Sequence, residues 1–96
     1  MNDRELYQQK MKAQLDGWRA DLDKLKARAS GATADVQLDI NRHTRTLERK
    51  IDEGKSKLSE LHAANEEAWE SVKKGVESAW GSLKTGFSDA ADRFKG

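Results

Sequence analysis

No proline occurs anywhere in the 96 residues of this chain, so nothing in the sequence forbids helix from one end to the other. From Met11 onward, apolar and small residues recur at steps of four and three, which is the spacing of one face of a helix. Strands would need apolar residues at every second position, and that alternation does not occur. We therefore predict an all-α fold.

The four-three spacing first defines a heptad stripe that we call the N-terminal stripe. It predicts coiled-coil packing of the helix that carries it. Its members are Met11, Leu15, Trp18, Leu22, Leu25, Ala29, Ala32 and Val36. Beyond Val36 the steps become four, four and three, which locally unwinds a left-handed supercoil. The regular spacing then resumes at Ile51, Gly54, Leu58 and Leu61.

An eleven-residue repeat occupies residues 68–96 and reads AWESVKKGVES, AWGSLKTGFSD and, truncated, AADRFKG. Eleven residues make three helical turns, so the apolar residues of successive copies stay on one face of the helix. We call this face the C-terminal stripe, and we expect it either to dock on the preceding helix or to face lipid. Its members are Trp69, Val72, Val76, Trp80, Leu83, Phe87, Ala91 and Phe94.

Two places in the chain could interrupt the helix. Asn65 is a good N-cap, and the acidic residues after it favour a helix start. Gly31 is a candidate helix stop and Thr33 a candidate cap for a new helix, but the N-terminal stripe passes both without losing phase. We therefore predict one domain with a long helix over about residues 3–62, a turn at about 63–66 and a second helix over about 66–95. If Gly31 also breaks the helix, the alternative is a monomeric three-helix bundle.

The long-helix arrangement has a consequence for quaternary structure. A second helix that folds back covers the first helix only from about Val36 to Leu61, so the N-terminal stripe is left bare. We expect such a stripe to bind another copy of the chain, and the antiparallel hairpins then form a homo-oligomer, most simply a dimer. The expected interface residues are Met11, Leu15, Trp18, Leu22 and Leu25.

Charge and composition exclude several classes of protein. Eighteen basic and 17 acidic residues give a net charge of +1, so we expect no nucleic-acid partner. There is no cysteine, so disulfide bonds and thiolate zinc sites are excluded. The N-terminus is charged from residue 3, and no apolar run is long enough for a membrane span. We expect a cytoplasmic protein, with peripheral membrane association as the alternative.

The sequence carries no motif for catalysis. His43 has Asp39 one turn before it and His62 has Glu66 one turn after it, but neither pair has a third metal ligand. No phosphate-binding loop, nucleophile elbow or metalloprotease motif occurs. We therefore predict no enzyme activity, no catalytic, cofactor-binding or metal-binding residue, and no cofactor.

Three segments resemble a group of small, uncharacterised bacterial coiled-coil proteins with a C-terminal AWxxΦKxGΦ repeat. The segments are MKAQLDGW (11–18), LDKLKARA (22–29) and AWESVKKGVESAWGSLKTGF (68–87). The resemblance implies a helical fold and self-association, and it transfers no catalytic residue. The eleven-residue repeat is also similar to those of apolipoproteins, synucleins and late-embryogenesis-abundant proteins, which implies a lipid-surface or desiccation role.

Together these observations predict a non-enzymatic, self-associating coiled-coil protein that acts as a structural or protein-interaction module. The alternative is an amphipathic protein that uses residues 68–96 to bind a membrane surface.

Overall fold

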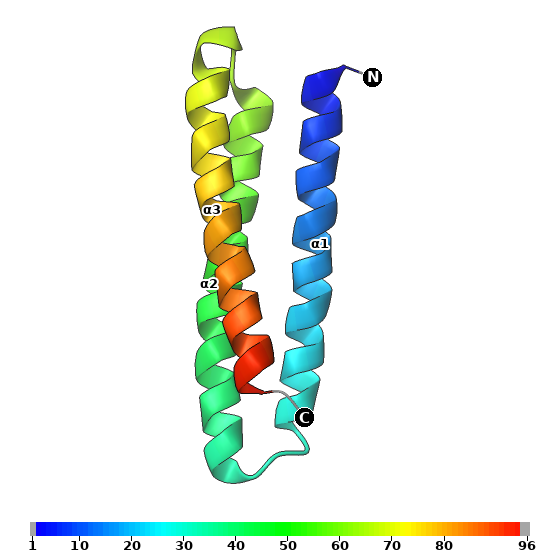
Figure 1. Cartoon of the computed structure of the whole chain (residues 1–96), viewed down its shortest axis with the longest axis vertical. Helices are drawn as coiled ribbons and strands as arrows, with labels where there is room; N and C mark the ends of the chain where they lie inside the picture. Colours follow the sequence, from blue (N-terminus) through cyan, green and yellow to red (C-terminus); the bar gives the residue numbers. More distant parts are fainter. Residues whose placement is uncertain (1, 95–96) are drawn as a thin grey trace.

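The structure is a computed structural model, and it describes residues 2–94 of the chain. It contains three helices, α1 (Asp3–Ala29), α2 (Ala34–Ala63) and α3 (Glu66–Arg93). Consecutive helices run antiparallel (Figure 1) and form an elongated bundle of 51 × 21 × 18 Å. The prediction of an all-α fold is confirmed.

The predicted unbroken helix over residues 3–62 is wrong. α1 ends at Ala29, and the N–H groups of Gly31 and Ala32 donate to carbonyls three residues back, at 3.3 and 3.2 Å. A straight helix of that length would measure about 90 Å. The chain instead turns at residues 30–33, so α2 can cover α1 and bury its stripe. The alternative three-helix bundle is the observed arrangement of one chain.

The second predicted turn is confirmed. Asn65 caps α3, and its side-chain oxygen accepts a hydrogen bond from the Ala68 N–H at 2.9 Å. Glu66 and Glu67 lie in the first turn, where negative charge complements the helix dipole. α3 ends at Arg93, and residue 95, where we expected the helix to end, lies outside the described residues.

The core lies along the axis of the bundle, and α2 is its central element. α2 packs on both α1 and α3, whereas α1 and α3 contact each other less closely. The stripes predicted from the sequence supply nearly all of this core, although Ala90 is buried where Ala91 was expected. The buried apolar residues are Met11, Leu15, Leu22, Leu25, Ala29, Ile40, Leu47, Ile51, Leu61, Trp69, Val76, Trp80, Leu83 and Ala90.

The end of the bundle that contains the α1–α2 turn extends beyond the C-terminal end of α3 (Figure 1). Arg93 near the end of α3 binds Asp39 through two hydrogen bonds, Nε to Oδ2 at 2.7 Å and Nη2 to Oδ1 at 3.2 Å. α3 therefore reaches the level of Asp39. Val36 and Leu38, which precede that level, are 43% and 60% exposed.

Candidate functional site

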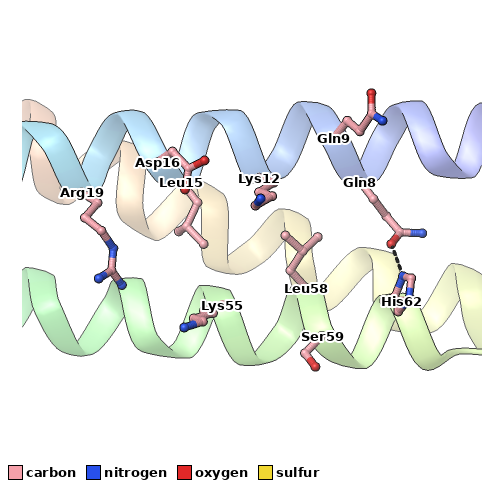
Figure 2. Close-up of a pocket in the computed structure, with 10 residues that line it drawn as sticks. All are labelled: Gln8, Gln9, Lys12, Leu15, Asp16, Arg19, Lys55, Leu58, Ser59 and His62. Atoms are coloured by element: carbon pink, nitrogen blue, oxygen red, sulfur yellow. Dashed lines mark hydrogen bonds between the residues drawn. The ribbon is translucent and has the colours of Figure 1, made fainter.

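A groove of about 470 Å³ lies between α1 and α2 (Figure 2). Leu15 projects into it from α1 and Leu58 from α2, and together they form an apolar floor. Leu15 is buried and Leu58 is half-buried, so the floor belongs partly to the core. The groove is lined by Gln8, Gln9, Lys12, Leu15, Asp16, Arg19, Lys55, Leu58, Ser59 and His62.

Helical spacing explains why charged side chains surround this floor. Lys12 and Arg19 lie three residues before and four residues after Leu15, so they flank it on the same side of α1. On α2, Lys55 lies three residues before Leu58 in the same way. The rim of the groove is therefore formed by residues one turn away from the two stripe leucines.

The rim carries more positive than negative charge. Lys12, Arg19 and Lys55 face a single carboxylate, that of Asp16, among the lining residues. Within residues 2–94, no ion pair includes any of these three cations. Lys12 and Lys55 line this groove, whereas Arg19 also lines a neighbouring hollow with the carboxylates of Asp23, Glu48 and Asp52.

A hydrogen bond closes one end of the groove. His62 near the end of α2 donates from Nδ1 to the side-chain oxygen of Gln8 on α1, at 2.9 Å (Figure 2). Gln9 and Ser59 point away from the groove in the same view. The open part of the groove is therefore bounded by the three cations and floored by the leucines.

The five residues predicted to join two copies of the chain are covered within one chain. Met11, Leu15, Leu22 and Leu25 are all buried, and Trp18 is half-buried. The premise that this stripe would be bare is therefore wrong, because the turn at residues 30–33 folds α2 over it. Self-association itself remains a prediction.

Trp18 contacts the C-terminal stripe directly. Its ring packs edge-on against Trp80 and stacks on Phe87, with both centroid distances at 6.2 Å. These contacts join α1 to α3, the pair of helices that otherwise meets least. Trp18 is therefore a packing residue between two helices of the same chain.

The C-terminal stripe docks on the other two helices, which is the first of its two predicted positions. Trp69, Val76, Trp80 and Leu83 are buried in the core. Val72, Phe87 and Phe94 are partly buried against it. In this arrangement the stripe faces protein rather than lipid.

Tyr7 was not singled out from the sequence; it lies four residues before Met11, on the same side of α1. It is half-buried, and its ring packs edge-on against Trp69 at 6.2 Å. Its hydroxyl donates to Glu77 Oε1 at 3.3 Å. The alternating spacing extended back from Met11 by three residues reaches Gln8, so the heptad pattern does not predict Tyr7.

The two histidines have different partners and do not form a metal site together. His43 is 3.9 Å from Asp39 and packs against Phe94, whereas His62 binds Gln8. Across the part of the chain that the structure describes, no three histidine, aspartate or glutamate side chains converge as metal ligands.

The repeat in α3 matches a known family model. The TMP repeat model matches residues 69–79 and 80–90, so each matched unit begins at a tryptophan. The predicted eleven-residue repeat is confirmed, with its units starting one residue later. The matches cover less than a quarter of the chain and indicate a repeat-containing helical protein. Comparisons with curated proteins and with solved structures gave no match.

Among residues 2–94, no helix is both long enough and apolar enough to cross a bilayer.

Proposed function

We propose that this chain is a non-enzymatic helical interaction module that binds an acidic amphipathic helix of another protein in the α1–α2 groove. The observation that supports this proposal is the apolar floor of Leu15 and Leu58 inside a rim of three cations. A helix that lays its apolar face in a hydrophobic groove is a recurrent mode of peptide recognition. Acidic residues beside that apolar face would meet Lys12, Arg19 and Lys55.

The experiment is a binding titration with a synthetic amphipathic peptide of about 15 residues, long enough for a helix to form on binding. Leucines on one face and glutamates beside them match the groove, and a peptide with lysines in place of the glutamates is the matched control. We expect the acidic peptide to bind and the basic peptide not to bind. Higher salt should weaken the binding because the charged rim is exposed to solvent.

The K12E/R19E/K55E variant tests the role of the rim. Reversal of three rim charges should raise the Kd of the acidic peptide about tenfold or more. K24E/R45E/K74E is the matched control, since it makes the same change in net charge at residues that do not line the groove. Equal affinities for the two triple variants would contradict the proposed site.

Binding to a lipid surface is the other function predicted from the repeats. Trp69 and Trp80, its expected anchors, are only 7% and 5% exposed, so α3 would have to leave α2 to present them. Flotation with vesicles of anionic or zwitterionic lipid, read with tryptophan fluorescence, distinguishes the two functions. Co-flotation with a blue shift would support the lipid function in place of the groove.

A further inference from the structure

The first and last residues of the turn between α1 and α2 both have helical φ values. Ser30 has φ −65° and ψ −23°, which are helical values. Thr33 also has a helical φ of −65°, and its ψ of 162° takes the chain out of the helix. Gly31 does not adopt the left-handed φ that would specifically require glycine at this turn. Straightening the turn requires at least a rotation of ψ at Thr33 to a helical value.

Thr33 adds little to hold the turn. It occupies the N-cap position of α2, but its side chain makes no capping hydrogen bond. Asn65 makes that bond at the start of α3. The α1–α2 turn is therefore the less strongly specified of the two turns.

The sequence is in phase for a continuous helix through this turn. Ala29, Ala32 and Val36 continue the four-three spacing, so a straight helix would place the buried faces of α1 and α2 along one side. Val36, exposed in the closed chain, would lie on the same side. The chain's own α3 ends at the level of Asp39 and could not cover the α1 half of that face.

We propose that two copies of this chain exchange α1 by straightening residues 30–33, forming a domain-swapped dimer with two long antiparallel helices. α1 makes specific contacts in the closed chain, including Lys26 with Glu48 and Tyr7 with Glu77. Each contact can form between the α1 of one copy and the α2–α3 hairpin of the other. A second copy of the chain would therefore cover the apolar face that straightening exposes.

Formation of the dimer adds helical hydrogen bonds at the turn, and it costs the translational and rotational entropy that is lost when two chains associate. Because the helix contacts are the same in both forms, their energies largely cancel. The balance is then set by the turn residues and by protein concentration. In the dimer the α1–α2 groove persists, with Lys12 and Arg19 from one copy and Lys55 from the other.

The test is the mass of the protein, measured by light scattering over a range of concentrations. Gly31→Ala favours helix at the turn in both copies and meets no atom within 4 Å, so the dimer dissociation constant should fall about tenfold or more. Ala34→Pro acts in the opposite direction. Proline is well tolerated at the first position of α2, but in a straight helix its ring would clash with the carbonyl of Ser30. This variant should remain a 10.8 kDa monomer.

Gly81→Ala is the matched control, because it makes the same change at an open position in α3 and should leave the dissociation constant unchanged. A dimer that persists in Ala34→Pro would overturn the exchange, since a side-by-side dimer does not depend on the turn. The exchange would also be overturned if the wild-type and Gly31→Ala chains both stayed monomeric up to about millimolar concentration. A dimer that weak would have a free energy of association of only about −4 kcal/mol.

Cross-linking distinguishes the two topologies within the dimer. The chain has no cysteine, so Q8C/H62C introduces a single pair at positions whose native side chains touch. A short bismaleimide should link two chains in the isolated dimer and one chain in the monomer. Only within-chain links in the dimer fraction would overturn the proposal. Acidic-peptide binding by Ala34→Pro separately tests the groove, which that variant retains.

Discussion

Tyr7 is the one tyrosine of the chain, and its phenol lies where α1 meets α3. Burial raises the pKa of Tyr7 from 10.0 to about 12, and the negative charge of Glu77 beside it adds to the effect. The ammonium group of Lys73 lies over the ring of Tyr7, with its Nζ 4.9 Å from the ring centroid. The neutral phenol is therefore the form that suits the folded chain.

The tyrosinate absorbance of this single residue should titrate with a midpoint of about 12 in the folded protein and near 10 in denaturant. Because the folded pKa is the higher one, the contribution of Tyr7 to stability is fully present below pH 10. It is lost as the pH rises from about 10 to about 12. Circular dichroism at each pH is the control that tests whether the helices persist during the titration.

Glu77→Gln removes one source of the shift and should lower the folded midpoint of Tyr7, which stays above 10 because burial is the larger cause. Glu67→Gln makes the same chemical change at an exposed position that does not act on Tyr7, and it should leave the midpoint in place. A midpoint near 10 in the folded wild-type protein would show that the phenol is hydrated.

At the scale of helices, the two turns differ in how their sequences specify them. Asn65 binds the Ala68 N–H and precedes two acidic residues, so the start of α3 could be predicted from local chemistry. The start of α2 has no such signal, because Thr33 makes no side-chain hydrogen bond. Gly31 and Thr33 marked that turn in the sequence, as a candidate helix stop and a candidate N-cap.

Phase continuity could not decide whether the helix breaks at Gly31. A straight helix that binds a second copy and a hairpin that binds itself both need the same side of α1 and α2 to be apolar. The spacing through Ala29, Ala32 and Val36 is therefore the same for the two arrangements. Such a pattern identifies the buried face but leaves the connection between the helices open.

The difference between the turns predicts unequal effects of two cap substitutions. Asn65→Ala should lower the free energy of unfolding by about 1 kcal/mol, because the Ala68 N–H loses its acceptor. Thr33→Ala removes no hydrogen bond and should change it by less than about 0.5 kcal/mol. Urea denaturation followed by helical circular dichroism measures both. Similar losses for the two variants would mean that the Asn65 side chain does not stabilise α3.

At the scale of the molecule, the apolar residues of one chain are enough to form a core that its own three helices cover. The expectation that a second copy must cover the N-terminal stripe assumed two helices, whereas three helices share their stripes around one axis. Most members of these stripes were predictable from spacing alone, with Val36 and Ala91 as exposed exceptions. The groove between α1 and α2 was not, because it depends on which helices are adjacent.

At Gly54 the backbone of α2 packs closely against side chains of both other helices. A Cβ at this position would lie 3.2 Å from both Leu83 Cδ1 and Trp80 Cζ3 on α3, and 3.5 Å from Leu15 Cδ1 on α1. The sequence placed Gly54 on the stripe but gave no reason for a glycine there. The reason is that a side chain on α2 would occupy the space where α1 and α3 meet it.

Gly54→Leu should therefore lower the free energy of unfolding by about 2 kcal/mol or more, because three packed side chains would have to move. Gly17→Leu is the matched control. A Cβ there meets nothing within 4 Å, so replacing a mid-helix glycine should raise stability by about 0.5 to 1 kcal/mol. Urea denaturation of both variants gives the comparison. If Gly54→Leu were as stable as Gly17→Leu, the three helices could not converge at residue 54, and the closed bundle would need a different packing.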